Sequence, residues 1–149
     1  MELSDQFSVG APPSEVWRLF WDLPRVARCL PGCESITSTG PDAYRASVVQ
    51  RVGPFKVAFD LDLAVEETVE MERVVVSGGG QDRMGNRLKL NRLSLELEEA
   101  SGGGTLVKYG LDFALMGRMA TLGNSAVKRK AEETRQEFTR RIAAEFGAE

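Results

Sequence analysis

Residues 55–65 read FKVAFDLDLAV. Apolar side chains occupy every odd position of this run, whereas Lys56, Asp60 and Asp62 occupy even positions. Because successive side chains of a strand point to opposite faces, the run predicts a β-strand with one apolar and one polar face. The two aspartates are therefore expected to point to solvent on the outer side of a sheet, rather than to form a desolvated catalytic pair.

The same period of two continues on both sides of this strand. Glycine- and proline-containing turns separate the alternating runs, with Gly53-Pro54 immediately before the strand and Gly78-Gly79-Gly80 expected to close the strand that follows it. The pattern predicts an antiparallel sheet of seven strands at residues 3–9, 34–39, 44–52, 55–65, 69–77, 87–97 and 107–115.

The alternation breaks within residues 87–97. Leu88 and Leu90 are at even positions, whereas the leucines from Leu93 onward are at odd positions. One inserted residue near Asn91-Arg92 would put all of these leucines on one face, so the slip predicts a β-bulge there.

Helical spacing occurs in three places. A proline-led helix follows residue 11, a second short helix is expected over residues 24–29, and residues 119–146 indicate one long helix. The order of a strand, two short helices, six strands and a helix predicts one two-layer α+β domain over residues 1–149. A curved sheet does not fit flush against a straight helix, so we expect a mostly apolar cavity between them. Val127, Ala131, Thr134, Phe138 and Ile142 recur every three or four residues and would form the buried stripe of the helix.

Composition excludes several kinds of chemistry. The sequence has no histidine, two cysteines and a net charge of −3. The absence of histidine excludes histidine-dependent nucleophiles and histidine-containing zinc sites. Two cysteines cannot complete a four-cysteine zinc site. An acidic chain is not expected to bind nucleic acid. No charge-free run exceeds nine residues, so no membrane span is expected, and acidic residues near Met1 do not fit a signal peptide. A cytoplasmic location with both thiols reduced is the expectation.

Three local patterns have both a functional and a structural interpretation. Cys29 and Cys33 flank a turn, where they would pack as small apolar residues; a redox or metal role would need a stabilised thiolate, and Arg28 is the only nearby positive charge. Gly80-x4-Gly85 has phosphate-loop spacing, but it lacks the Lys-Ser/Thr pair and joins two strands, which indicates a flexible hairpin. Charges along residues 128–141 fit either ion pairs on a solvated helix face or peripheral contact with anionic lipid.

Aromatic and methionine side chains on the apolar sheet face indicate a ligand cavity, although the same residues could simply fill a core. Gly117 and Gly123 bracket the junction of the last strand and the helix and would permit hinge motion there. Loop residues Arg51, Gln81, Arg83 and Arg118 are candidates for the cavity rim. The candidate ligand-binding residues are Phe55, Val57, Phe59, Leu61, Leu88, Leu90, Tyr109, Leu111, Phe113, Met116, Met119, Leu122 and Ala126.

A more specific signal is the stretch VARCLPGCE at residues 26–34, preceded by Val16-Trp17 and followed by Gly40-Pro41-Asp42-Ala43-Tyr44 and Val52-Gly53-Pro54. With Gly78-Gly79-Gly80-Gln81-Asp82 and residues 117–123, the chain resembles the carbon monoxide dehydrogenase CoxG family over nearly its whole length. Element order resembles the helix-grip fold of the START and pollen-allergen (SRPBCC) superfamily, which commonly encloses a hydrophobic ligand tunnel.

This resemblance implies a non-enzymatic accessory protein for an aerobic CO dehydrogenase-type molybdenum hydroxylase. Its ligand would be a quinone or lipid, with no metal or covalent cofactor, and peripheral contact with the inner face of the membrane would accompany that role. Family members can carry an extension beyond the long helix, whereas this sequence stops at Glu149, so a docking role that needs such a tail is not expected. Two alternatives stay open: a cyclase- or aromatase-like enzyme using Tyr109, and a maturation factor that binds no ligand.

Overall fold

The computed structural model describes residues 1–146; the last three residues of the predicted domain lie outside the described part. Seven antiparallel strands form one sheet in the order β1-β7-β6-β5-β4-β3-β2. The strands are β1 (Glu2–Val9), β2 (Cys33–Gly40), β3 (Ala43–Val52), β4 (Phe55–Val69), β5 (Arg73–Gln81), β6 (Arg87–Glu99) and β7 (Thr105–Met116).

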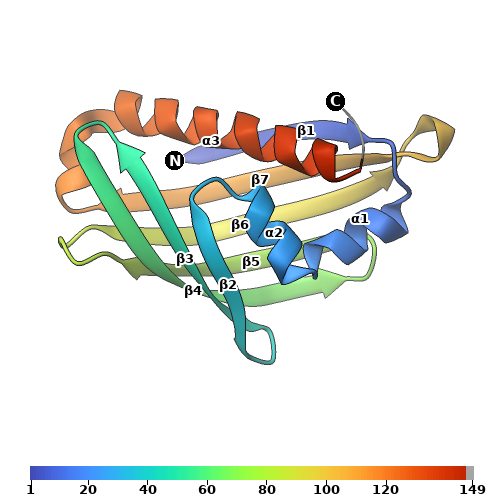
Figure 1. Ribbon diagram of the computed structural model, residues 1–149, viewed down its shortest axis with the longest axis horizontal. Coiled ribbons are helices and arrows are strands. Elements are labelled where there is room, and N and C mark those ends of the chain that lie inside the picture. The colour runs from blue at the N-terminus through green and yellow to red at the C-terminus, as the bar shows by residue number, and fades with distance from the viewer. Residues whose placement is uncertain (147–149) are drawn as a thin grey trace.

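The helices lie on one side of this curved sheet (Figure 1). The longest, α3, contacts both β1 and β3 and therefore bridges the two sides of the curve. None of the helices within residues 1–146 is long and apolar enough to cross a membrane. The helices are α1 (Pro13–Phe20), α2 (Leu23–Cys29) and α3 (Gly123–Glu145), with two 3-10 helices, η1 (Ser101–Gly103) and η2 (Arg118–Leu122).

The alternation predicted for β4 is confirmed. Val57 and Phe59 are buried, whereas Lys56, Asp60 and Asp62 are exposed. The predicted bulge is also confirmed, because the pairing of β6 with β7 shifts by one residue between Leu90 and Arg92. A period-2 pattern was therefore sufficient to orient the faces of these strands correctly.

The glycine triplet at residues 78–80 does not close a strand, so that prediction was wrong. All three glycines lie within β5, and β4 continues to Val69. The turn between these strands instead lies at residues 70–72, where Met71 has a φ of 60°.

Close contact between strands explains why glycine stands in the middle of β5. An added Cβ at Gly80 would lie 1.8 Å from the carbonyl oxygen of Asp60, and one at Gly78 would lie 2.1 Å from that of Asp62. Neither position has room for any side chain, so these glycines allow β5 to approach β4 closely.

The long helix begins later than predicted. Residues 118–122 form η2 instead, and α3 begins at Gly123. Gly117 has a φ of 102° and Gly123 a φ of 83°, values that interrupt a regular helix and that glycine adopts without strain. The chain therefore enters α3 through a separate short segment with a glycine at each end.

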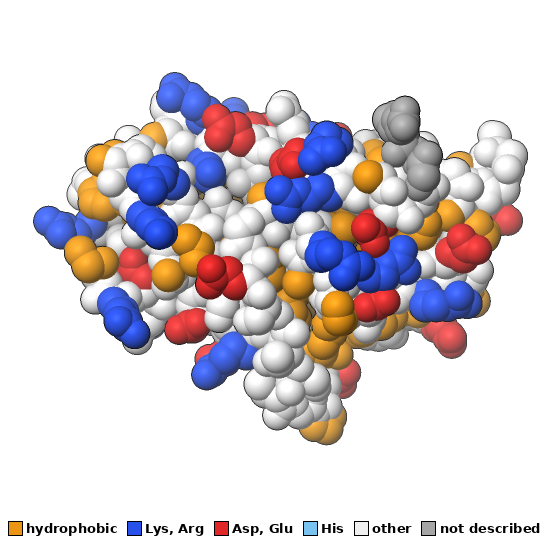
Figure 2. Space-filling view, in the orientation of Figure 1, with side chains coloured by type: hydrophobic (Ala, Val, Ile, Leu, Met, Phe, Trp, Pro, Cys, Tyr) orange, Lys and Arg blue, Asp and Glu red, His pale blue; other side chains and the backbone are white. Residues whose placement is uncertain are grey.

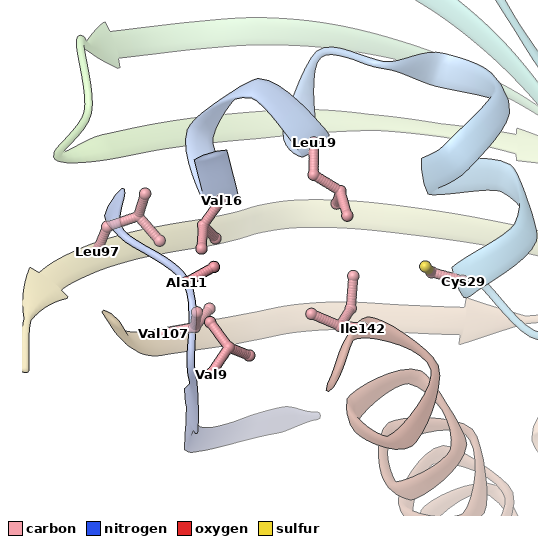
Figure 3. Packing of buried hydrophobic residues seen from close by; sticks show 8 residues of the cluster. All are labelled: Val9, Ala11, Val16, Leu19, Cys29, Leu97, Val107 and Ile142. Carbon is pink, nitrogen blue, oxygen red and sulfur yellow. The ribbon is translucent and has the colours of Figure 1, made fainter. Parts of the chain in front are cut away.

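Two buried apolar clusters hold the layers together. The first joins β1, α1, α2, β6, β7 and α3 through side chains that converge in Figure 3: Val9, Ala11, Val16, Leu19, Cys29, Leu97, Val107 and Ile142. The second lies at the η2 end and consists of Val52, Val57, Phe59 and Met119.

The charges of α3 form ion pairs along the helix. Glu132 accepts a hydrogen bond from Arg135 at 2.7 Å, and Glu137 accepts from Arg140 at 2.6 Å and Arg141 at 3.0 Å. The two arginines lower the pKa of Glu137 to about 2, so it stays ionised across the physiological range. This arrangement agrees with the solvated-face interpretation of the sequence.

Candidate ligand cavity

A cavity of about 370 Å³ lies between the concave face of the sheet and the helices. This volume is within the range of small-molecule sites. The apolar face of the sheet supplies much of its wall, and α3 supplies the stripe predicted from helical spacing, Val127, Ala131, Thr134, Phe138 and Ile142.

Most of the predicted ligand-binding residues line this cavity. Those in its wall are Val57, Phe59, Leu61, Leu88, Leu90, Tyr109, Leu111, Phe113 and Met119. Their contact with a ligand stays a prediction.

Four predicted residues have other positions. Phe55 and Leu122 pack behind the wall, against the buried cluster at the η2 end. Met116 is 41% exposed and follows Leu115 by one residue, which turns its side chain to the outer face of the sheet. Ala126 is half-buried on α3, beside Val127, which does line the cavity.

The charged rim predicted from the loops is not present at this cavity. Gln81 and Arg83 line a separate groove on the outer face of the sheet, and Arg51 and Arg118 are exposed outside the wall. The cationic side chains that do border the cavity are Lys130 and Arg135 of α3.

Sequence reasoning also missed the contribution of the short helices and of β3. Leu19, Phe20, Val26 and Leu30 close the cavity on one side, and Gln50 of β3 adds a polar group. The sequence predicted the short helix that carries Leu19 and Phe20, but helical spacing contained no sign that these residues border a cavity.

Tyr109 of β7 places a polar group in the cavity wall. Its hydroxyl lies 3.4 Å from Oγ1 of Thr139, and its ring packs edge-to-face on Phe7 and Phe138. Arg135 is held by Asp5 and Glu132, which compensate its charge and raise the pKa of the guanidinium. This arrangement suits hydrogen bonding to an oxygen of a ligand better than it suits proton transfer.

A buried asparagine fixes η2 against the β5–β6 hairpin. Asn86 is 1% exposed, and its Oδ1 accepts a hydrogen bond of 2.9 Å from the backbone N–H of Met119. Its own backbone N–H and its Nδ2 donate to the carboxylate of Asp82 at 2.8 and 2.9 Å. Met119 is thereby held in the cavity wall by the hairpin.

The Asp82 carboxylate also organises the hairpin itself, which the sequence predicted to be flexible. It accepts a further hydrogen bond from the backbone N–H of Met84 at 2.9 Å. Burial acts to raise the pKa of Asp82, but the hydrogen bonds from Asn86 and Met84 outweigh it and lower the pKa. The hairpin is therefore a fixed turn between antiparallel strands, and it presents no helix N-terminus to a phosphate.

The two cysteines are free thiols. Cys29 is 1% exposed within the first buried cluster, and burial, followed by the nearby Glu145, raises its pKa. Burial also raises the pKa of Cys33, which is only half-buried. Residues 1–146 contain no group of three or more potential metal-ligating side chains.

We expect a water-soluble disulfide reagent at pH 7 to modify Cys33 and to leave Cys29 unmodified until the protein unfolds. Because both folded-state pKa values are raised, the thiols favour folding below the ordinary pKa of 9.0, and this contribution is lost as the pH rises through the folded values. Thiol counts in buffer and in urea test the first statement, and urea midpoints between pH 7 and 10 test the second. Equal labelling rates for both thiols would contradict the packing of Cys29.

Comparison with known proteins gives one family match. The family model for CoxG of carbon monoxide dehydrogenase matches residues 6–147. No curated protein matches the chain.

Solved structures show the same fold at low sequence identity. A conserved protein from Geobacillus kaustophilus is 18% identical with a TM-score of 0.88, covering 99% of this chain and 95% of that one. A START superfamily protein from Mycobacterium smegmatis is 15% identical with a TM-score of 0.75, covering 98% and 97%. The Zhui aromatase/cyclase from Streptomyces sp. R1128 is 10% identical with a TM-score of 0.64, covering 99% and 93%. The predicted helix-grip fold is therefore confirmed.

Proposed function

The chain belongs to the carbon monoxide dehydrogenase CoxG family, and from this premise we propose that it is a binding protein for a hydrophobic molecule, a quinone or a lipid. In this proposal it acts without catalysis as an accessory protein of an aerobic CO dehydrogenase-type molybdenum hydroxylase. Its place is the cytoplasm, with peripheral contact at the inner face of the membrane. The observation that supports it best is the 370 Å³ cavity with its mostly apolar wall.

The wall of this cavity favours a ligand with a long apolar part and few polar atoms. Aliphatic and aromatic side chains from β4, β6, β7 and α3 surround the space. Transfer of an apolar molecule from water into such a site lowers the free energy of the system. Polar atoms are confined to a few positions, among them Gln50, Tyr109, Lys130 and Thr134. Tyr109 and Lys130 can donate hydrogen bonds to a quinone carbonyl or to a lipid head group, whereas the hydroxyl of Thr134 already donates to the backbone carbonyl of Lys130.

Filling the cavity should abolish binding. Ala131 lies in the wall on α3, whereas Ala144 is exposed on the same helix. We expect Ala131→Phe to weaken quinone affinity by at least about tenfold, because the added ring occupies the space that the ligand needs. Ala144→Phe is the matched control and should bind as the parent chain does. The measurement is quenching of tryptophan fluorescence during titration with a soluble quinone.

The same proposal predicts a bound ligand in protein from a quinone-producing host. Native mass spectrometry should show an added mass, and solvent extraction should release a quinone or lipid from the parent chain but not from Ala131→Phe. Absence of any extracted molecule, together with unchanged tryptophan fluorescence during titration, would refute the carrier function.

A catalytic function is the second candidate, because Tyr109 places a hydroxyl in the cavity wall beside Thr139. The Zhui protein of the same fold is described as an aromatase/cyclase, which gives the substrate class to test. Turnover of an aromatic polyketide that Tyr109→Phe abolishes would support the enzyme. If the parent chain shows no detectable turnover and Tyr109→Phe retains quinone binding, the result supports the carrier function.

A further inference from the structure

A second concavity, of about 1120 Å³, lies on the outer face of the sheet, on the side away from the ligand cavity. It extends across β4, β5 and β6 near the β5–β6 hairpin. We call it the outer groove and define it by its lining residues Arg45, Lys56, Ala58, Asp60, Asp62, Gly79, Gly80, Gln81, Asp82, Arg83, Met84, Arg87, Leu88, Lys89 and Met116.

Strand register explains the shape of the outer groove. Gly79 pairs with Asp62 on one side and with Lys89 on the other. A glycine, which has no side chain, therefore lies between two residues whose side chains project from the sheet. Ala58 extends the low floor along β4. One step nearer the hairpin, Arg87 pairs with both Gln81 and Met116. The result is a shallow floor of small residues bordered by long side chains.

The acidic groups of the outer groove already have partners. Asp62 accepts a hydrogen bond from Arg45 at 3.0 Å, and Asp60 accepts one from Ser47 at 3.0 Å. Asp82 is occupied by the N–H groups of the hairpin.

Most basic groups of the outer groove, in contrast, have no carboxylate partner. Within residues 1–146, no salt bridge involves Lys56, Arg83, Arg87 or Lys89, and all four are exposed. A chain of net charge −3 therefore carries a local excess of positive charge here. Figure 2 views the molecule from the side of the helices and shows basic and apolar side chains together at the end where Figure 1 places the β5–β6 hairpin; the outer groove lies on the far face, outside this view.

Two exposed methionines complete the surface. Met84 at the hairpin is 59% exposed, and Met116 at the end of β7 is 41% exposed. Methionine adapts its shape to different apolar partners and is common at binding surfaces. Large apolar side chains beside unpaired basic groups are typical of a surface that contacts another molecule.

We propose that the outer groove binds an extended acidic segment of a partner protein that carries apolar residues among its carboxylates. An extended polypeptide segment can enter a groove with raised sides, whereas the flat surface of a bilayer cannot. Asp60 and Asp62 carry negative charge into the groove and would repel a continuous polyanion such as nucleic acid. Carboxylates that are spaced along a peptide can instead contact the basic side chains on either side of these two aspartates. This inference goes beyond the proposed function and does not depend on it, because the groove and the cavity lie on opposite faces of the sheet.

The test uses a fluorescent twelve-residue peptide of alternating Glu and Leu, with a Gln-for-Glu version as the uncharged comparison. We expect the acidic peptide to bind the full chain, and its affinity to fall by about tenfold between 50 and 300 mM salt, because the contacts are exposed ion pairs. Arg87→Glu combined with Lys89→Glu should weaken binding by at least about tenfold, since the same side chains would then repel the peptide.

The matched control combines Lys128→Glu with Arg129→Glu, two exposed residues of α3 that change the net charge equally. It should bind the peptide within a factor of about two of the parent chain. Equal loss in both double variants would show a nonspecific charge effect and overturn the proposal. Binding of phosphatidylserine vesicles without binding of the acidic peptide would overturn it as well. Quinone titration of the groove variant should be unchanged, which separates this proposal from the carrier function.

Discussion

Gly80→Ala should destabilise the fold strongly. The new Cβ would lie 1.8 Å from the carbonyl oxygen of Asp60, and the contact is with backbone, which cannot move aside as a flexible side chain would. Relief of the overlap requires β5 to separate from β4, which breaks the hydrogen bonds between them. We expect a loss of at least about 3 kcal/mol in the free energy of unfolding, a large part of the stability of a domain of this size.

Urea denaturation followed by circular dichroism measures this loss, and Gly10→Ala is the matched control. A Cβ at Gly10 would meet no atom within 4 Å, and its φ lies outside the positive range that favours glycine. That variant should unfold within about 0.5 kcal/mol of the parent chain, or be slightly more stable. If Gly80→Ala retains the parental urea midpoint, the close approach of β5 to β4 is wrong.

Asn86→Asp should destabilise the protein strongly although it changes only an amide to a carboxyl. The parent side chain donates from Nδ2 to the carboxylate of Asp82 at 2.9 Å and is 1% exposed. An acid at this position cannot donate when ionised, and it would place two carboxylates together away from water. We expect a loss of about 3 kcal/mol at pH 7, from the lost hydrogen bond and the buried like charges.

The pH dependence distinguishes this explanation from simple misfolding. Burial and the neighbouring Asp82 would raise the folded-state pKa of the introduced carboxyl above its unfolded value of about 4. The penalty is therefore present at neutral pH and shrinks as the pH falls toward that unfolded value, where the new group is protonated in both states. Urea midpoints of variant and parent should converge between about pH 7 and 4.

Asn124→Asp provides the control for Asn86→Asp, since Asn124 is exposed in the first turn of α3. It makes the same chemical change in water and should stay within about 0.5 kcal/mol of the parent chain at every pH. A deficit of Asn86→Asp that did not change with pH would argue against carboxylate repulsion. Faster release of a bound quinone from Asn86→Asp would further show that this asparagine holds Met119 in the cavity wall.

Strand faces could be predicted from the sequence because their signal is local. The odd positions of residues 55–65 are apolar, and the change of parity after Leu90 gave the bulge, which the register with β7 confirms. Each inference needed only that one face of the sheet is buried, which the alternation itself implies. The buried stripe of α3 was predicted for the same reason, from helical spacing.

The incorrect predictions concern features that depend on which other part of the fold a segment packs against. Three successive glycines fit a turn and also fit a strand pressed against its neighbour, and only the position of the Asp60 carbonyl distinguishes these cases. Arg83 was assigned to the cavity rim, but its place depends on the direction in which the β5–β6 hairpin bends. The contribution of Phe20 to the cavity likewise depends on the gap between layers, which has no local signature.

Strand order has a consequence for the way in which the chain folds. Each strand from β2 to β6 pairs with the next strand in sequence, whereas β1 pairs only with β7, so that Glu2 lies opposite Asp112. Closing so long a loop costs more conformational entropy than forming a hairpin, and sheets that need such contacts fold slowly. β1 is synthesised before the other six strands of this sheet and therefore stays unpaired until β7 has been made. The side of the cavity that contains Leu3 and Leu111 is completed only then, so a ligand can be enclosed only after synthesis has passed β7.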